Sequence, residues 1–106
     1  MNPQAITAAV SRARYLGLSA SNLQALCILS VQGSCSLNHI ASELAVSSAA
    51  VTSIADKLEH LTFASRSHNR HDRRGISLAI TDHGREALAD IIRDATVASW
   101  ENLTPA

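Results

Sequence analysis

The stretch "LNHIASELAVSSAAVTSIADKLEHL", residues 37–61, decides the fold because it contains two short helical patterns separated by a turn. Residues 37–44 and residues 48–61 both place apolar side chains three and four positions apart, the spacing that builds one face of a helix. A serine cap precedes the second pattern, and about three residues, "AVS", separate the two. Two amphipathic helices joined by so short a turn predict a helix-turn-helix.

The side of the second helix that faces away from its apolar stripe is small and polar. It carries Ser48, Ala49, Thr52, Ser53, Asp56 and Lys57. Short side chains near the N-terminus of a helix let that helix lie deep in a groove without steric obstruction. This surface is therefore the first candidate for a binding face.

After this helix the apolar spacing changes to every second residue. "FASR" at residues 63–66 and "GISLAI" at residues 75–80 both alternate, which predicts two strands joined by a hairpin loop. Residues 66–74 of this hairpin contain several cationic and imidazole side chains: Arg66, His68, Arg70, His71, Arg73 and Arg74. The hairpin therefore has a strongly basic tip.

Three further helices flank this centre. Residues 3–16 begin with a capping asparagine and a proline, and a second helix begins at Ser19 or Ser21 and ends before Gly33. We expect its inward side to carry Leu23, Leu26, Cys27, Ser30 and Val31. Thr81 caps a last helix that ends near Leu103, whose inward side carries Leu88, Ile91, Ile92 and Ala95. The fold class is mainly α (α+β), and residues 1–106 are predicted to form a single domain.

Composition and charge narrow the function classes. Hydrophobic residues make up 46% of the chain and charged residues 17%, which favours a packed fold over disorder. No apolar run reaches the roughly 18 to 20 residues of a membrane span, and the start lacks the order of a secretory signal, so we expect a soluble, cytoplasmic protein. The net charge is zero, yet residues 60–81 hold four arginines and one aspartate, a local charge of +3. Such a local potential attracts a polyanion.

Catalytic, cofactor and metal sites are not predicted. The chain has no Ser-His-Asp arrangement, no glycine-rich phosphate loop and no paired carboxylates in a suitable context. His68, His71 and Asp72 have a spacing compatible with a metal, but three ligands on one loop make a poorly preorganised site. Cys27 falls on the apolar side of its helix, which predicts an unreactive thiol, whereas Cys35 lies in a turn and is the better candidate for a redox-active one.

The order of helix, helix, helix-turn-helix, hairpin and helix resembles the MarR family of bacterial transcriptional regulators. The resemblance covers residues 23–88. It rests on the helix-turn-helix of residues 37–61, on the wing "RSHNRHDRRGISLAIT" and on the continuation "TDHGREAL". The most specific residues are Asp72, Arg73, Arg74, Leu78, Thr81 and Gly84.

This resemblance implies a winged helix-turn-helix, formed by residues 36–80 with a two-stranded wing, that binds double-stranded DNA. The helix of residues 48–61 would enter the major groove, and Arg73 and Arg74 at the wing tip would enter the flanking minor groove, with Asp72 orienting one of them. The implied DNA-binding residues are Ser47, Ser48, Ala49, Thr52, Ser53, Lys57, Arg66, Arg70, Asp72, Arg73 and Arg74. His68, Asn69 and His71 would add phosphate contacts.

The resemblance also implies a homodimer, held by the terminal segments 1–16 and 88–103, that acts as a repressor on a pseudo-palindromic operator. A small-molecule effector would bind between the dimerisation and DNA-binding regions. Ala5, Ile6, Ala9, Val10 and Ala13 form an apolar stripe on the first helix, and Ile91, Ile92, Ala95, Val97 and Trp100 give the last helix more apolar surface than one core needs.

The chain departs from the family pattern in three ways. Thr62 stands where the family usually has glycine, and because a β-branched residue disfavours a left-handed conformation we expect this helix end to differ. Lys57 is the only lysine or arginine on the helix of residues 48–61, and the terminal helices look short for a family-type dimer.

Two other functions stay open beside the DNA-binding regulator. The alternative is a winged-helix module that binds another protein and has little affinity for DNA. A third hypothesis is a thiol switch at Cys35 that acts on DNA binding.

Overall fold

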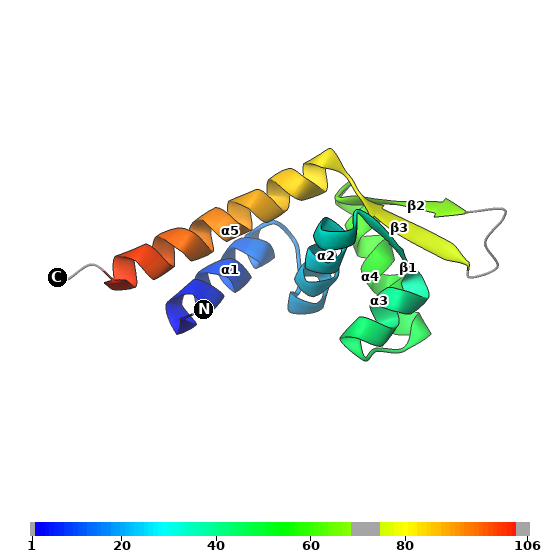
Figure 1. Ribbon diagram of the computed structural model, residues 1–106, viewed down its shortest axis with the longest axis horizontal. Coiled ribbons are helices and arrows are strands. Elements are labelled where there is room, and N and C mark those ends of the chain that lie inside the picture. The colour runs from blue at the N-terminus through cyan, green and yellow to red at the C-terminus, as the bar shows by residue number, and fades with distance from the viewer. Residues whose placement is uncertain (1, 69–74, 104–106) are drawn as a thin grey trace.

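The computed structural model describes residues 2–68 and 75–103, which form five helices and a three-stranded sheet (Figure 1). In chain order the elements are α1 Pro3–Tyr15, α2 Ala20–Gln32, β1 Ser34–Ser36, α3 Leu37–Leu44, α4 Ser48–His60, β2 Ala64–His68, β3 Ile76–Ile80 and α5 Asp82–Leu103. The strands are antiparallel in the order β1-β3-β2. This is the mainly helical, winged arrangement that the sequence predicts.

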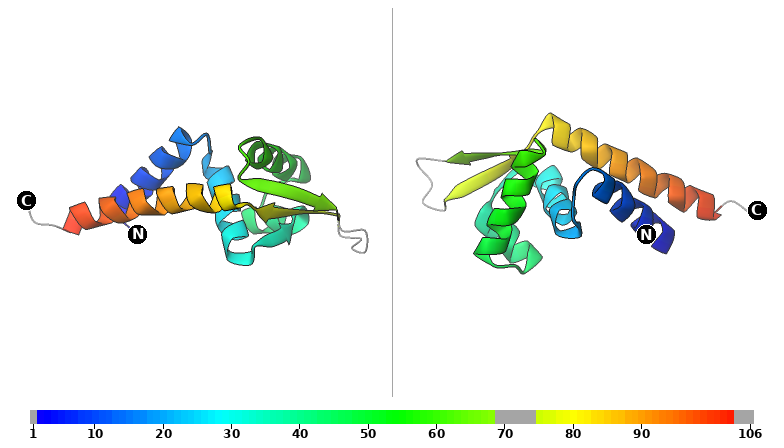
Figure 2. Two further views of the ribbon diagram at one scale, coloured as in Figure 1. Left: turned by 90° about the horizontal axis from the view of Figure 1, so that it is seen from above. Right: turned by 180° about the vertical axis from the view of Figure 1, so that it is seen from behind.

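The elements divide into an arm, made of α1 and α5, and a body, made of α2, α3, α4 and the sheet. The views from the front, above and behind agree that α1 runs beside α5 and that α2 stands between this arm and the α3–α4 pair (Figures 1 and 2). The β2–β3 hairpin projects from the end of the body opposite to the arm. The binding face predicted for α4 and the wing therefore lies away from the terminal helices.

Short polar side chains start each helix. The side-chain oxygens of Asn2, Ser19, Ser36 and Ser47 each accept a hydrogen bond from a backbone N–H three residues later, at the start of α1, α2, α3 and α4. The Thr81 hydroxyl does the same for Gly84 at 3.0 Å and starts α5. These bonds satisfy N–H groups that have no partner within the helix. The predicted starts of all five helices are confirmed, with Ser19 and not Ser21 as the cap of α2.

The core lies in the body and draws one or two large side chains from most of its elements. The largest fully buried ones are Leu26, Leu29, Ile40, Leu58 and Leu78. In the arm, by contrast, the fully or nearly fully buried residues include small ones, Ala5 and Ala13 of α1 and Ala87 and Ala95 of α5. Small side chains let the two helices approach closely, which explains how a chain poor in aromatic residues packs its arm.

The sheet has one more strand than the two predicted. β1 pairs with β3 so that Cys35 lies opposite Leu78, and the backbone N–H of Ile80 donates to the carbonyl oxygen of Gly33 at 3.0 Å. Three residues, "SCS", are too few to show a period of two, and their extended form depends on the pairing with β3. Cys35 therefore lies in a strand and not in a turn.

The inward side of α2 is also different from the prediction. Its buried residues are Asn22, Ala25, Leu26 and Leu29, whereas Cys27 is exposed and Val31 is 85% exposed. The prediction that Cys27 faces the core is therefore wrong. α2 has apolar residues around much of its circumference and contacts elements on two sides, so three-and-four spacing alone does not identify which side is buried.

On α5 the predicted core residues Leu88, Ile91 and Ala95 are buried, but Ile92 is 57% exposed. Ile92 follows Ile91 directly, and neighbouring residues of a helix point about 100° apart. Ile6 of α1 likewise follows the buried Ala5, and Val97 of α5 lies two residues, about 200°, from the buried Ala95; both are about half exposed. The arm thus keeps an apolar surface that its own core does not cover.

Candidate nucleic-acid interface

The outward side of α4 has the small, polar surface that the sequence predicts. Ser47, which caps the helix, and the residues Ser48, Ala49, Thr52, Ser53, Asp56 and Lys57 are all exposed. The opposite side buries Val51, Ile54, Ala55 and Leu58 against the body. This burial holds α4 rigidly and leaves its small side chains accessible.

The turn between α3 and α4 positions the N-terminus of α4. Ala45 takes a left-handed conformation, with φ of 55°, and its N–H donates to the Ser42 carbonyl at 3.2 Å while the Val46 N–H donates to the Ala41 carbonyl at 3.0 Å. These two backbone bonds end α3 abruptly. The chain then needs only the Ser47 cap to begin α4.

Arg66 of β2 lies against α4. Its Nη1 donates to Glu59 Oε1 at 2.8 Å, and its Nη2 donates to Asp56 Oδ1 at 2.6 Å and to the Thr52 carbonyl oxygen at 3.2 Å. The Arg66 side chain is 24% exposed, against 63% for Asp56 and 37% for Glu59. A guanidinium held in this way connects the wing strand to α4, and a DNA contact by Arg66 stays a prediction.

Sequence reasoning missed Glu59 and the role of Asp56 in this cluster. Glu59 precedes Arg66 by seven residues, and the turn between α4 and β2 brings the two together. The signal in the sequence was two acids three positions apart on a helix followed by an arginine in a strand. Acids and arginines in such a pattern commonly point into solvent without pairing. Only the tertiary structure shows that these three side chains are paired.

The end of α4 is joined to the start of α5. Thr62 takes a left-handed conformation, with φ of 64°, although its β-branched side chain disfavours it. The N–H groups of Thr62 and Phe63 donate to the carbonyls of Glu59 and Leu58, both at 2.9 Å, which is the Schellman ending usually built on glycine. The expected difference at this helix end is therefore not found.

Side chains compensate for the threonine at this position. The Thr62 hydroxyl lies 2.5 Å from both the Leu61 carbonyl oxygen and His83 Nδ1, and the Thr81 hydroxyl donates to the Thr62 carbonyl at 2.6 Å. Gly84 packs so closely that a Cβ atom there would lie 2.1 Å from the Phe63 carbonyl oxygen. The Thr-x-x-Gly motif thus fixes the base of the wing between α4 and α5.

The predicted wing residues Asn69, Arg70, His71, Asp72, Arg73 and Arg74 lie outside the described residues, as does the side chain of His68. The strands that carry them pair in register from Ala64 opposite Ile80 to His68 opposite Ile76. Among the described residues 48–68, the cationic Lys57 and Arg66 are matched by the acidic Asp56 and Glu59. The excess positive charge near this face therefore comes from residues 69–74 of the sequence.

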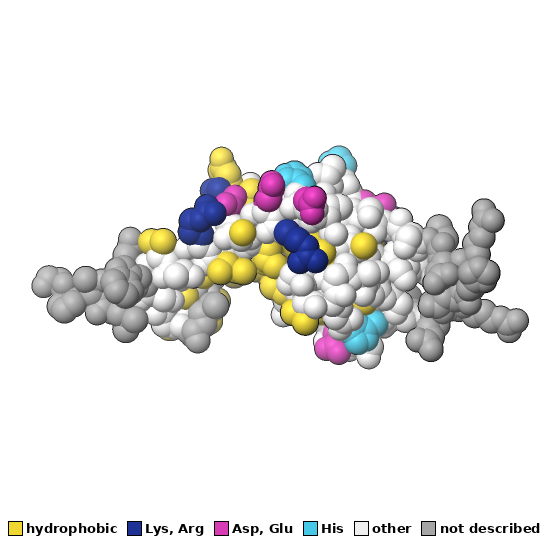
Figure 3. Space-filling view, turned by 45° about the horizontal axis from the view of Figure 1, so that its top comes forward, with side chains coloured by type: hydrophobic (Ala, Val, Ile, Leu, Met, Phe, Trp, Pro, Cys, Tyr) yellow, Lys and Arg dark blue, Asp and Glu magenta, His cyan; other side chains and the backbone are white. Residues whose placement is uncertain are grey.

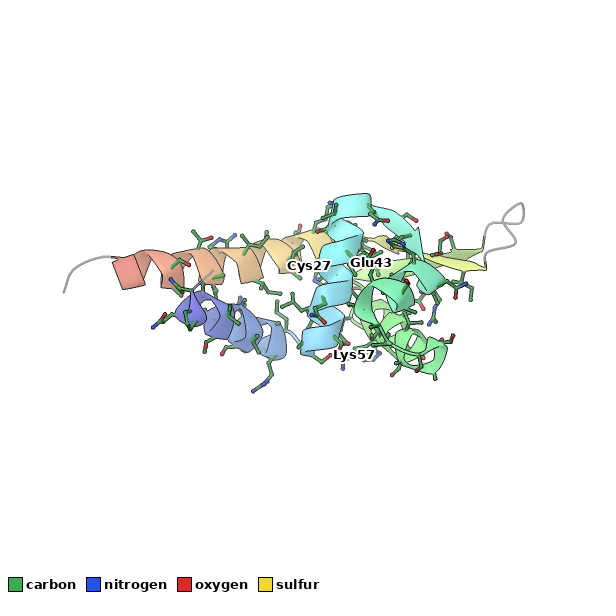
Figure 4. The ribbon with its side chains drawn as sticks, turned by 60° about the horizontal axis from the view of Figure 1, so that its bottom comes forward. Cys27, Glu43 and Lys57 are labelled. Carbon is green, nitrogen blue, oxygen red and sulfur yellow. The ribbon has the colours of Figure 1, made fainter. Side chains whose placement is uncertain are left out.

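A groove of about 650 Å³ lies between α1, α2 and α5. Hydrophobic side chains gather in the hollow between the arm and the body (Figure 3). The described residues that line it include Ile6, Leu23, Cys27, Leu88 and Ile92, and none of the described lining residues is charged. In the view of Figure 4, Cys27 lies on the side of α2 toward the arm, and Glu43 of α3 and Lys57 of α4 lie on the other side.

The two thiols are poor nucleophiles where they stand. Desolvation by the residues packed around each thiol raises the pKa of Cys27, although that side chain is exposed at the groove, and of the half-buried Cys35 above the usual 9.0, so the thiolate fraction of each at neutral pH is small. Redox activity of Cys35 stays a prediction, and the raised pKa weighs against it. Among residues 2–68 and 75–103 there is no cluster of three His, Cys, Asp or Glu side chains that would hold a metal ion, and no helix is long and apolar enough to cross a membrane.

The chain is similar to known proteins in both sequence and fold. The family model described as "MarR family" matches residues 18–76. The chain is 40% identical over 86 residues to the "HTH-type transcriptional repressor MdtR" of Bacillus subtilis (strain 168), covering 79% of this chain and 56% of that protein. The chain spans about half the length of the curated relatives it matches.

Solved structures agree with the sequence comparison. The YusO protein from Bacillus subtilis superposes with a TM-score of 0.84 at 28% identity, over 93% of this chain and 70% of that one. A mutant of S. aureus MepR, solved bound to an oligodeoxyribonucleotide, superposes with a TM-score of 0.79 at 18% identity, over 95% of this chain and 76% of that one. At that identity the second match establishes the fold alone.

Proposed function

Because this chain belongs to the MarR family of transcriptional regulators, we propose that it is a sequence-specific repressor that binds double-stranded DNA as a homodimer. The observation that carries this proposal is the outward side of α4, where small polar side chains are exposed on a helix that the core holds rigidly. The proteins of this family to which the chain is similar are regulators and not enzymes, in agreement with the prediction from the sequence. We place this activity in the cytoplasm of a bacterium, without a cofactor.

α4 would lie in the major groove with its N-terminal turns toward the bases. Thr52 and Ser53 are the central candidates for base contacts, and Lys57 is suited to a phosphate. The proposed contacts of this helix and its cap are Ser47, Ser48, Ala49, Thr52, Ser53 and Lys57. Arg66 lies beside them, bonded to Asp56 and Glu59.

The wing would supply most of the cationic contacts. Arg70, Arg73 and Arg74 are proposed to approach the phosphates and the flanking minor groove, where a narrow A·T-rich stretch concentrates negative potential. Asp72 would orient one of the arginines through a charge-assisted pair. This part of the proposal rests on the sequence and on the pairing of β2 with β3, which points the hairpin away from the arm.

The arm is proposed to hold the dimer. Ile6, Ile92 and Val97 are each about half exposed, and a second copy would remove this apolar surface from water. Two α4 helices would then face successive major grooves about one DNA turn, roughly 34 Å, apart, which requires a pseudo-palindromic operator. The groove beside Cys27 is a candidate site for a small, apolar effector.

Selection of binding sites from a random duplex library tests this proposal. The wild-type chain is expected to enrich a pseudo-palindrome, and the Arg73→Ala/Arg74→Ala variant is expected to enrich it poorly, because each lost phosphate contact weakens binding. Arg85→Ala removes a positive charge from an exposed position of α5 outside the segments proposed for dimerisation and serves as the control for the loss of charge alone. No enrichment by the wild type, with only weak binding at low salt, would favour a module that binds another protein.

A further inference from the structure

Two carboxylates stand on or beside the face that we propose to meet DNA. Asp56 lies on the outward side of α4 next to Lys57, with 63% of its side chain exposed, and Glu59 lies one turn further with 37% exposed. Carboxylates this close to phosphates oppose binding, because like charges repel across partly solvated distances. A DNA-binding helix with two such acids needs something to neutralise them.

Arg66 is placed to do this. One guanidinium reaches both acids, with Nη2 at 2.6 Å from Asp56 and Nη1 at 2.8 Å from Glu59, and Nη2 also donates to the Thr52 carbonyl at 3.2 Å. The bond to Thr52 directs the guanidinium along α4. The Arg66 side chain is only 24% exposed, so it is held within the chain and does not extend into solvent as a phosphate-binding arginine would.

The same bonds connect two elements that must both reach DNA. β2 begins the wing, and the Arg66 backbone N–H donates to Glu59 Oε2 at 3.4 Å in addition to the side-chain bonds. Together these bonds link α4 to the first strand of the wing through two acids and one carbonyl group of the helix. A change here alters the position of the wing relative to α4.

We infer that Arg66 is a positioning residue for DNA binding: it neutralises Asp56 and Glu59 on α4 and holds the wing against that helix, without contacting a phosphate itself. The inference rests on the proposed DNA-binding function. It differs from the role that the sequence suggested, in which Arg66 binds DNA directly. Arg66, Asp56 and Glu59 together carry a net charge of −1, and the two acids without Arg66 carry −2.

The two roles differ in their dependence on salt. A phosphate contact contributes about 0.9 to the slope of log affinity against log salt, so removing an arginine that binds phosphate in both copies of the proposed homodimer lowers the slope by about 1.8. An arginine that neutralises acids within the protein leaves the number of phosphate contacts unchanged. Removing one of the acids as well restores the charge of the cluster, so most of the affinity returns, although the guanidinium bonds between β2 and α4 stay lost.

The test measures affinity for a fluorescein-labelled duplex recovered from the selection above, at several salt concentrations. The proteins are wild type, Arg66→Gln, Asp56→Asn, the Arg66→Gln/Asp56→Asn double variant and Lys57→Gln, which removes one positive charge from the same helix. Arg66→Lys is a conservative variant that keeps the charge but lacks the planar fork by which the guanidinium holds both carboxylates and the Thr52 carbonyl. Urea unfolding of each protein shows that it is folded at the temperature of the binding measurement.

Arg66→Gln is expected to weaken binding about tenfold with a fall in the salt slope well below about 1.8, since the loss is a repulsion that salt partly screens and not a missing phosphate contact in each copy. The double variant is expected to bind within about threefold of wild type, Asp56→Asn alone to bind more tightly than wild type, and Arg66→Lys to fall between Arg66→Gln and wild type. Lys57→Gln is expected to lower the slope by about 1.8, because one phosphate contact is lost from each copy.

Two results would overturn the inference while leaving DNA binding intact. One is a fall of about 1.8 in the slope for Arg66→Gln, with no recovery in the double variant, because both results are those of a direct phosphate contact in each copy. The other is wild-type affinity in Arg66→Gln. A wild-type chain that binds no duplex at any salt concentration would instead reject the proposed function, and the inference with it.

Discussion

The two helices of the helix-turn-helix end in the same backbone conformation, but with different surroundings. α3 ends at Ala45, with φ of 55°, where the side chain is exposed and two backbone bonds complete the turn. α4 ends at Thr62, with φ of 64°, where the start of α5 covers the turn and side chains add three further bonds. The exposed turn needs only its backbone, whereas the covered joint depends on particular side chains.

Gly84→Ala should give the largest effect, because it affects the covered joint directly. The new Cβ atom would lie 2.1 Å from the Phe63 carbonyl oxygen, which already accepts a bond from the Thr81 N–H at 3.0 Å and cannot move away freely. We expect a loss of about 3 kcal/mol in the free energy of unfolding, measured in urea. Glu86→Ala, at an exposed position of the same helix, is the control, and an equally small loss in both would show that the joint is not tightly packed.

Thr81→Val should have the second largest effect. Valine has the same shape but neither accepts from the Gly84 N–H at 3.0 Å nor donates to the Thr62 carbonyl at 2.6 Å. The expected loss is about 2 kcal/mol in the free energy of unfolding. Thr81→Ser keeps the hydroxyl and should retain most of this stability. A serine variant as unstable as the valine variant would assign the effect to packing.

Ala45→Gly should change stability in the opposite direction. Glycine adopts a left-handed conformation without the steric penalty that alanine pays, and the exposed Ala45 side chain packs against little. We expect a gain of about 0.5 to 1 kcal/mol, after the larger entropy of the unfolded glycine chain is subtracted. Thermal unfolding monitored by circular dichroism would detect the rise in Tm. A lower Tm would mean that the Ala45 methyl group contributes to the turn.

Thr62→Gly should have the smallest effect, although it relieves the same backbone conformation. The gain from glycine is offset by the loss of the hydroxyl, which lies 2.5 Å from the Leu61 carbonyl oxygen and from His83 Nδ1. The expected change is below about 0.5 kcal/mol in either direction. If Thr62→Gly stabilises the chain as much as Ala45→Gly does, these side-chain bonds contribute nothing and the two helix ends are equivalent.

Local patterns predicted most of the body. The capping side chains and the apolar spacing of residues 37–61 predicted α3 and α4 with bounds correct to about one residue, and the exposed side of α4 follows from the same spacing. The alternation in residues 63–66 and 75–80 predicted the hairpin, although β2 extends two residues further, to His68. These features are predictable because each depends on residues within one or two turns of the chain.

The candidate site was predicted less completely. The small polar residues of α4 were found because their spacing places them on one side of one helix. The pairing of Arg66 with Asp56 and Glu59 was not predicted. In the sequence, an arginine in a strand near a basic loop looks the same whether it pairs with acids of the protein or contacts DNA. Distance and partial burial show the pairing, and both depend on how β2 packs against α4.

By itself, the sequence determined where helices begin and end, which side of α4 is exposed and which family the chain resembles, since caps, periodicity and motifs are properties of neighbouring residues. The tertiary structure decided the pairing of β1 with β3, the side of α2 that is buried, the groove beside Cys27 and the partners of Arg66. Each of these joins elements that are apart in the chain. Their contacts follow from how whole surfaces pack, and a pattern within one element does not contain that information.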